Sequence, residues 1–307
     1  MNIAASGLVF DQFGNVLLIQ RDDTRTFAPP GGSLDAFELP DAACVREVRE
    51  ETGIIVHPVR LVGLHYQDSM PDGMLILTFR CIQRGGEITP SPESPVVGWF
   101  KAVDLPRPMF GMHRERIEMT YRHAGGPPVW ERYRLSVGER FGRFLLFNVV
   151  YRWKNWRRKV NGEPDYVRPP GWKVGAFVVI KNEAGAVLWV KRTDGDVWNL
   201  PGGGGEPHEA PWETAVRETY EETGLNVKLT NLTSINVYEN SNEMCFTFTA
   251  TIEDGTLTTG AESADFAYFQ PGEEPANCVL QHIERVQDSL QENTTFRKQP
   301  GPHAVFP

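Results

Sequence analysis

The sequence predicts an α/β protein that contains the same mixed-sheet domain twice. A stretch of 41 residues beginning at Gly14 aligns without a gap with the stretch beginning at Gly185, and 17 of these positions are identical. Strand-like runs and helical patterns follow in the same order in both copies. The chain has 307 residues, of which 40% are hydrophobic, and this is enough for two ordinary domains with buried cores. We therefore expect two α/β/α sandwich domains in tandem, each a mixed β-sheet flanked by helices.

The repeat also places the domain boundaries. Equivalent residues lie 171 positions apart up to Ile54 and Leu225, and the match resumes 169 positions apart where ESPVVGWF aligns with ESADFAYF. We expect an N-terminal domain over residues 1–123 and a C-terminal domain over residues 171–307. A duplication of this kind also suggests that the two domains pack against each other as an intrachain pseudo-dimer.

Residues 124–170 match neither copy and carry ten Arg or Lys against four Asp or Glu. We interpret this segment as a basic, aromatic connector. Its FGRFLLFNVVYRWKNWRRKV run fits packing between the domains, which we favour, or a basic amphipathic helix on a membrane surface. The PDYVRPPG stretch that follows has the composition of a stiff linker.

The elements within each copy follow from local patterns. The runs SGLVF and NVLLIQR in the first copy, and FVVI and AVLWVKR in the second, predict strands that lead into a Pro-Gly-Gly loop. A helix follows, with Pro40 or Pro211 in its first turn and Gly53 or Gly224 at its end. The runs MLILTFRCI and MCFTFTATI predict later strands, and helical patterns near residues 110–122 and 279–292 complete the copies.

Three carboxylates share one face of the predicted helix in each copy. Glu47, Glu50 and Glu51 stand at positions i, i+3 and i+4, so their like charges repel. Divalent cations with oxygen ligands, Mg²⁺ in particular, are the natural compensation. A solvated acidic face is the ordinary explanation of such a helix, but the recurrence of the whole spacing favours a metal site. The second copy has Glu218, Glu221 and Glu222.

The loop before the helix contributes two glycines per copy. Gly31 and Gly32, like Gly202 and Gly203, let backbone groups approach a metal ion or a phosphate because no Cβ stands in the way. A plain turn is the alternative for a Gly-Gly pair alone, and the carboxylate helix at a fixed distance favours the site.

An arginine precedes the first glutamate of each triplet. We expect Arg46 and Arg217 to orient the carboxylates through ion pairs rather than to take part in the chemistry. Glu38 and Glu209, which open the helix, are expected either to pair with these arginines or to stabilise the helix N-terminus electrostatically.

Together these residues resemble the Nudix box, G-x5-E-x7-R-E-U-x-E-E-x-G-U, where U is a bulky aliphatic residue. The first copy fits every position, and the second departs only at Thr219. The box covers 23 residues in each copy, and with the flanking elements the likeness extends over residues 1–123 and 171–295. The resemblance implies Mg²⁺- or Mn²⁺-dependent hydrolysis of the diphosphate bond of a nucleoside diphosphate linked to another moiety.

The resemblance also implies roles for individual residues. Glu93 and Glu262, before a late strand, are implied as general bases or further ligands, and Arg21 and Arg192 are candidates to bind substrate phosphate beside the glycines. A surface ion pair with Asp23 or Asp194 explains these arginines nearly as well. The implied metal ligands are Gly32, Glu47, Glu50, Glu51, Gly203, Glu218, Glu221 and Glu222.

Composition limits the other classes of function. A formal net charge of −9 argues against indiscriminate binding to nucleic acid, which draws on a broad basic surface. No apolar run is long enough to span a membrane, the N-terminus does not resemble a secretion signal, and four separated cysteines indicate a reducing compartment, so we expect a cytoplasmic protein. The alternative function is a nucleotide-binding sensor or scaffold in which one domain is catalytic and the other regulatory.

Overall fold

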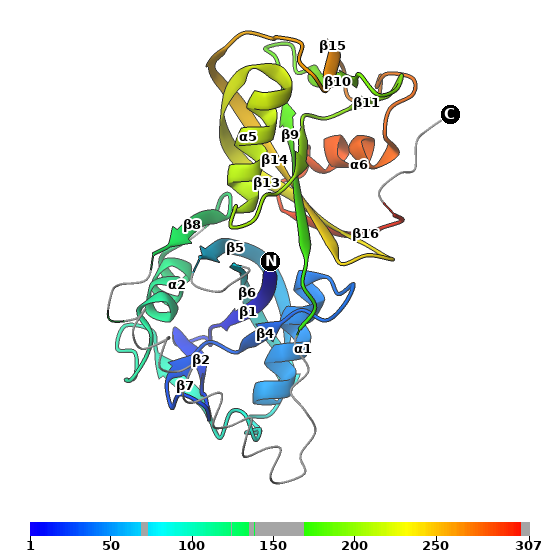
Figure 1. Cartoon of the computed structure of the whole chain (residues 1–307). Helices are drawn as coiled ribbons and strands as arrows, with labels where there is room; N and C mark the ends of the chain where they lie inside the picture. The colour runs from blue at the N-terminus through cyan, green and yellow to red at the C-terminus, as the bar shows by residue number, and fades with distance from the viewer. Residues whose placement is uncertain (69–72, 124, 135–137, 139–168, 302–307) are drawn as a thin grey trace.

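The computed structural model describes residues 1–68, 73–123, 125–134, 138 and 169–301, which form two α/β halves (Figure 1). The N-terminal half contains β1 (Asn2–Val9), β2 (Asn15–Gln20), β3 (Phe27–Ala28), β4 (Gly31–Ser33), α1 (Pro40–Thr52), β5 (Ile54–Gln67), β6 (Met74–Gly86), β7 (Val96–Lys101), α2 (Gly111–Arg122) and β8 (Val129–Tyr133). The C-terminal half contains β9 (Lys173–Ile180), β10 (Val187–Arg192), β11 (Trp198–Asn199), β12 (Gly202–Gly204), α5 (Pro211–Thr223), β13 (Leu225–Tyr238), β14 (Glu243–Gly255), β15 (Ser263–Phe269), α6 (Leu280–Asp288) and β16 (Thr295–Gln299).

Both halves have the same sheet topology. The larger sheet has the strand order β4-β1-β6-β5-β8 in the first half and β12-β9-β14-β13-β16 in the second. In each larger sheet the first strand, β1 or β9, pairs in parallel with β6 or β14. Its other neighbour is the short glycine strand, β4 or β12, which pairs with it antiparallel at the edge of the sheet. A three-stranded sheet, β3-β2-β7 or β11-β10-β15, completes each half. The expected mixed sheet is therefore confirmed.

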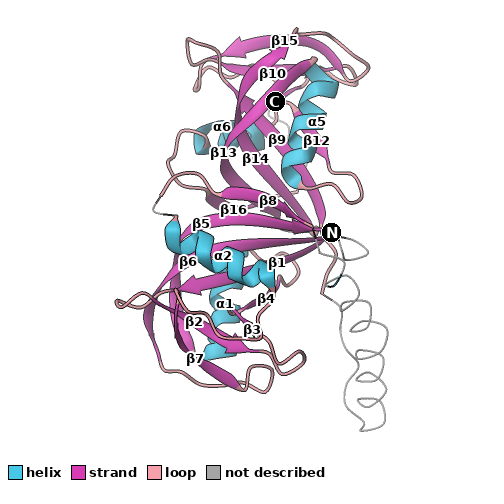
Figure 2. Cartoon of the chain, turned by 90° about the vertical axis from the view of Figure 1, so that its left-hand side faces the viewer, coloured by secondary structure: helices cyan, strands magenta, loops and turns pink. Residues whose placement is uncertain are grey.

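Helices cover both faces of each larger sheet, as a sandwich requires. Ala5 and Leu77 belong to the same apolar cluster as Val48 of α1, whereas the adjacent Ala4 and Ile76 pack with Met112 of α2. Successive strand residues point to opposite faces, so α1 and α2 lie on opposite sides of the sheet. Figure 2 shows α5 and α6 flanking the C-terminal sheet in the same way.

The glycine-terminated helices begin and end where the sequence predicts. Pro40 and Pro211 stand in the first turns, where a missing N–H costs nothing. Gly53 and Gly224 adopt φ angles of 75° and 73° at the C-caps, a left-handed conformation that glycine tolerates without a Cβ penalty. The two helices therefore start at the same distance from their glycine loops.

The N-terminal sheet continues beyond residue 123, where we expected the connector to begin. Strand β8 pairs in parallel with Gly63–Gln67 of β5, and β16 pairs in the same way with Ser234–Tyr238 of β13. The edge strand is therefore part of the repeat. Leu64 and Ile235 are equivalent residues, and they pair with Trp130 and Phe296, so the two copies of this strand lie 166 positions apart. Most of segment 124–170, including both proposed interpretations of its basic aromatic run, lies outside the described residues.

The two halves contact each other through equivalent residues. The Met1 amino group donates a hydrogen bond to the Trp172 carbonyl at 3.0 Å, and the Trp172 N–H donates to the Met1 carbonyl at 2.8 Å. Trp130 packs edge-on against Phe248 with ring centroids 5.5 Å apart, and Phe79 packs against Phe296 at the same distance. Buried residues from both halves form one apolar cluster.

The four cysteines are free and buried. Among the described residues, no helix has the length and apolar character needed to cross a membrane.

The fold predicts an acid-sensitive N-terminal half. His65 of β5 is 6% exposed, and burial together with the nearby Arg116 lowers the pKa of its imidazole to about 3. The unfolded chain takes up a proton below about pH 6.5 and the folded chain does not, so stability is lost as pH falls below 6.5.

We expect His65→Asn, which introduces the residue that the C-terminal half has at the equivalent position 236, to weaken this dependence. Thermal unfolding midpoints between pH 7.5 and pH 5 measure it. Equal slopes for the variant and the parent protein would show that His65 does not control the acid response.

Candidate active site

The centre of the N-terminal site is the guanidinium group of Arg46 in α1. Its Nη1 donates to Glu47 at 2.8 Å and to Glu50 at 3.3 Å, while Nε and Nη2 donate to the two carboxylate oxygens of Glu38 at 2.9 and 2.8 Å. Nη2 also donates to the Ser33 carbonyl of β4 at 3.0 Å. These bonds raise the pKa of Arg46, with Glu38 as the largest cause, and they connect the glycine strand to the carboxylate helix.

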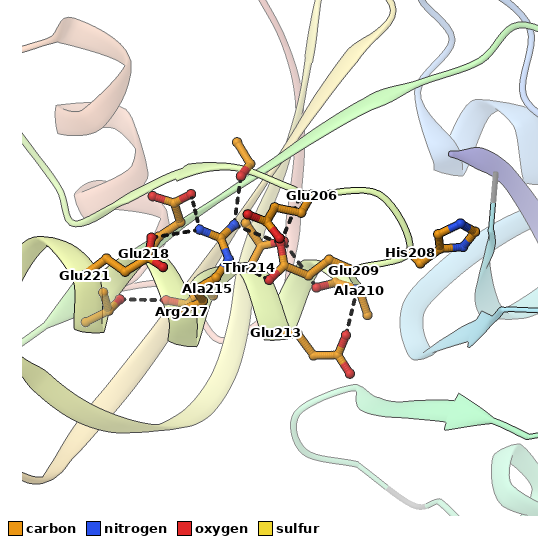
Figure 3. A network of polar contacts seen from close by, with 12 residues as sticks. Glu206, His208, Glu209, Ala210, Glu213, Thr214, Ala215, Arg217, Glu218 and Glu221 are labelled. Atoms are coloured by element: carbon orange, nitrogen blue, oxygen red, sulfur yellow. Dashed lines mark hydrogen bonds and ion pairs between the residues drawn. The ribbon is translucent and has the colours of Figure 1, made fainter.

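The C-terminal half repeats this network atom by atom (Figure 3). Arg217 donates to Glu218 at 2.8 Å, to Glu221 at 3.0 Å and to both carboxylate oxygens of Glu209 at 2.8 Å. The Gly204 carbonyl of β12 accepts a further bond at 3.0 Å. One difference is that Glu209 here also accepts a bond from the Thr214 hydroxyl at 2.9 Å.

The third glutamate of each triplet is buried and faces the glycine loop. Glu51 accepts the Gly31 N–H at 2.8 Å, and Glu222 accepts the Gly202 N–H at 2.9 Å. Burial raises the pKa of each carboxyl to about 7, and the neighbouring negative charges of Glu47 or Glu218 add to the shift. A cation beside these carboxyls would favour their charged form and so oppose this shift.

The second glycine of each loop lies directly against the first glutamate. A Cβ added to Gly32 would lie 2.5 Å from the carboxylate of Glu47, and one added to Gly203 would lie 2.5 Å from that of Glu218. Any side chain at these positions would displace the carboxylate or the strand. The loop therefore needs glycine here because of the close approach.

The donor set fits a hard divalent cation. Arg46 occupies only one oxygen of Glu47 and one of Glu50, which leaves the other oxygen of each carboxylate for a ligand. Burial of Glu51 beside Glu47 and Glu93 gathers negative charge, which a cation would neutralise. In the part of the chain that the structure describes, no three acidic, His or Cys side chains already stand in ligating geometry.

The remaining predicted residues border the same carboxylates. Burial raises the pKa of Glu51 and Glu222, and the charges of Arg21 and Arg192 partly oppose this rise, although the two arginines also pair with Asp23 and Asp194. Glu93 and Glu262 lie in exposed loops before β7 and β15. The charge of Glu93 raises the pKa of Glu51, and the charge of Glu262 raises the pKa of Glu218 and Glu222.

Two serines that sequence analysis used only as alignment markers also reach the site. The Ser94 hydroxyl donates to Glu51 at 3.4 Å, and the Ser263 hydroxyl donates to the Glu222 carbonyl at 2.6 Å. Both serines are buried and follow the loop glutamates directly in the chain. The sequence feature that could have identified these serines was their position directly after Glu93 and Glu262 in both copies.

Comparison with known proteins gives matches to both halves. The NUDIX domain model matches residues 1–121 and 171–287. The chain is 34% identical over 128 residues to a MutT-like protein of Streptomyces ambofaciens, covering 42% of this chain and 81% of that protein. It is 36% identical over 117 residues to a putative 8-oxo-dGTP diphosphatase of Bacillus subtilis, covering 37% and 77%.

Solved structures of similar proteins cover about half of the chain. A NUDIX hydrolase from Nitrosomonas europaea has 22% identity and a TM-score of 0.40, covering 45% of this chain and 84% of that one. A MutT protein from Bacillus halodurans has 23% identity and a TM-score of 0.40, covering 45% and 93%.

The glycine contact predicts a matched pair of variants in β12. We expect Gly203→Ala to displace the Glu218 carboxylate and to weaken Mn²⁺ binding at the C-terminal site about ten-fold, as loss of ligand positioning does. Gly204→Ala is the control, because no atom of the residues that the structure describes lies within 4 Å of a Cβ added there. Isothermal titration with Mn²⁺ measures both, and equal affinities would contradict the steric argument.

Proposed function

Because the chain belongs to the NUDIX domain family and is a Nudix hydrolase, we propose that it hydrolyses the diphosphate bond of a nucleoside diphosphate linked to another moiety. The linked group is a nucleotide, a sugar or a group of the ADP-ribose type. The observation that carries the proposal is the complete arginine–glutamate network, which occurs in both halves with matching distances. We propose that both sites are catalytic.

The family acts with divalent metal ions, and we propose Mg²⁺ or Mn²⁺ here. The residues that would hold the ions are the three glutamates of each helix and the backbone of Gly32 or Gly203. A bound ion would neutralise the anhydride oxygens and lower the pKa of the attacking water. Arg46 and Arg217 hold the glutamates in the required rotamers, and Glu38 and Glu209 fix the arginines.

The reaction needs an acceptor for one proton. Water attacks phosphorus, the bond from phosphorus to the bridging oxygen breaks, and two phosphate-bearing products leave, while the proton of the water passes to a carboxylate. We propose Glu93 and Glu262 for this role, because their exposed loop positions leave them free to approach a substrate. Arg21 and Arg192, together with the glycine loops, would bind the substrate phosphates.

We propose that the two sites prefer different substrates. Between α6 and its sheet, the C-terminal half buries polar atoms that have no hydrogen-bond partner among the described residues, on Asn236, Thr247, Gln281, Arg285 and Gln299. The N-terminal half also leaves buried polar atoms of His65 and Arg116 without such partners on the equivalent face, but it has Met112 and Tyr133 where the C-terminal half has Gln281 and Gln299. Buried polar groups left unpaired favour a ligand that can pair with them, so the difference supports unequal recognition of the non-phosphate moiety.

We further propose that the two domains form an intrachain pseudo-dimer. The paired hydrogen bonds of Met1 with Trp172, and the equivalent contacts Trp130–Phe248 and Phe79–Phe296, are reciprocal, as in the interface of a twofold-symmetric dimer. Small-angle scattering of the full chain tests this arrangement. A radius of gyration typical of two extended, non-contacting domains would contradict it.

The domain boundaries, the cytoplasmic location and the lack of a nucleic-acid partner stay predictions.

A nucleotide-binding sensor or scaffold, with one catalytic and one regulatory domain, is the alternative. Binding alone gives no reason to keep both carboxylate networks, and the two are equally complete. Tight nucleotide binding without phosphate release over hours would support this alternative.

The central prediction concerns paired substitutions. We expect Glu50→Gln with Glu51→Gln to remove metal-dependent turnover from the N-terminal site, and Glu221→Gln with Glu222→Gln to remove it from the C-terminal site. Each loss should be about a hundred-fold or more, because the neutral amide binds a divalent ion poorly. Product release from nucleotides with Mg²⁺ measures turnover, and an unchanged rate in the fourfold variant would exclude hydrolysis at these sites.

The same double variants separate the two substrate preferences. Each leaves one intact site in an otherwise complete chain, so a panel of nucleotide sugars, ADP-ribose, dinucleoside polyphosphates and 8-oxo-dGTP can be assayed on one site at a time. We expect the two sites to rank these compounds differently. Identical rankings would contradict the proposed difference in recognition.

A further inference from the structure

We propose that Arg132, which belongs to the N-terminal half, positions the catalytic network of the C-terminal half. The inference rests on the proposed hydrolysis at the C-terminal site and adds a control of that site by the other domain. Arg132 lies on β8 beside the start of α5, where the two halves meet (Figure 1).

Arg132 binds the C-terminal half through three of its donors. Its Nε donates to Glu213 at 3.0 Å, and its Nη2 contacts the other oxygen of the same carboxylate, so the pair is bidentate. Nη2 also donates to the His208 carbonyl at 3.0 Å. In its own half, the guanidinium group pairs with Asp68 and lies 4.8 Å from the centre of the Tyr66 ring. A bidentate, stacked arginine is held in one orientation.

The two groups that Arg132 holds lie on either side of Glu209. His208 has a φ of 64°, a left-handed conformation that costs about 1 kcal/mol or more in a non-glycine residue and needs support from its surroundings. Glu213 accepts the Ala210 N–H at 2.9 Å and so closes the first turn of α5. Figure 3 shows Glu209 between them. Arg132 therefore supports both ends of the segment that presents Glu209.

Glu209 transmits this support to the proposed metal ligands. It accepts two hydrogen bonds from Arg217, and Arg217 donates to Glu218 and Glu221. Without Arg132, the His208 backbone and the Glu213 carboxylate lose a charged partner, so the Glu209 segment becomes freer to move. Ligand carboxylates held less firmly reach the reactive geometry less often, and this lowers the catalytic rate more than substrate binding.

The reverse contacts are weaker. Phe37, the equivalent of His208, donates its N–H to the Asn242 side chain of the C-terminal half at 3.3 Å, a bond between neutral groups. Tyr66 of β5 and Val237 of β13 are equivalent residues, 171 positions apart. Tyr66 pairs with Arg132 and Val237 pairs with Lys298, so Lys298 is the equivalent of Arg132. Lys298 lowers the pKa of Glu38 through its charge, but across the described residues no hydrogen bond joins the two side chains. The position equivalent to Glu213 is Ala42, which offers no carboxylate. The control therefore acts mainly from the N-terminal half on the C-terminal site.

An ordinary interface ion pair is the competing explanation. Such a pair contributes little to stability, and its loss would affect both halves or neither. Arg132 itself lies in the N-terminal sheet, so a purely structural effect of its removal would fall at least as strongly on the N-terminal site. The proposal makes the opposite prediction, and the two single-site backgrounds can distinguish them.

The test places Arg132→Ala in the full chain carrying either Glu50→Gln/Glu51→Gln or Glu221→Gln/Glu222→Gln. In the first background, where the C-terminal site acts alone, we expect kcat to fall about ten-fold with KM within about two-fold. In the second background, where the N-terminal site acts alone, both constants should stay within about two-fold. Arg132→Lys should recover only part of the kcat, because lysine cannot form the bidentate pair.

Two further measurements complete the test. Lys298→Ala, the matched control, should change the activity of neither site by more than about two-fold. Hydrogen exchange should become faster in residues 205–213 of Arg132→Ala but not in the equivalent residues 34–42. An unchanged kcat at the C-terminal site, equal losses at both sites, or unchanged exchange in residues 205–213 would overturn the proposal. If the parent with only the C-terminal site shows no turnover, the proposed function fails at that site, and the exchange measurement alone decides the positioning role.

Discussion

Repulsion between carboxylates on one helical face is the constraint around which each half of this protein is organised. Two like charges about 4 Å apart repel by about 4 kcal/mol at the effective dielectric constant near a protein surface. Arg46 and Arg217 offset part of this cost by bonding two glutamates of the triplet from one nitrogen. The third carboxylate is buried on the backbone of the glycine loop, where charge is costly. The remaining excess of negative charge is what a divalent cation would relieve.

The rest of the fold places this helix against its loop. Proline in the first turn and glycine at the C-cap set the limits of α1 and α5, and the edge position of β4 and β12 brings the glycines against the first glutamate. Duplication then supplies a partner surface, since residues of both sheets share one apolar cluster. The interface is reciprocal in its apolar contacts but not in its ion pairs, because Arg132 faces Glu213 whereas Lys298 faces no equivalent carboxylate. One half can therefore act on the other.

Sequence analysis could predict what depends on short, fixed spacing. The α1 and α5 limits and the mixed sheets follow from residues close together in the chain or repeated in both copies. The pairing of Arg46 with Glu38 was one of two alternatives, and the structure shows that ion pair. Strand β8 could not be predicted, since it is five residues long, its partner β5 is distant in sequence, and its copy lies at a different spacing. The Arg132 contacts depend on how the halves pack, which no local pattern encodes. Ser94 was visible in the repeat, but its bond to Glu51 depends on the tertiary fold.

The positions at which divalent ions bind test the proposed sites most directly. Crystals grown with Mn²⁺ and a nucleoside diphosphate whose bridging oxygen is replaced by a methylene group would locate the ions by anomalous scattering. We expect peaks between the glycine loop and the glutamate triplet of each half, with the diphosphate group of the analogue beside them. Peaks absent from both triplets, or an analogue bound on the opposite face of either helix, would contradict the assignment.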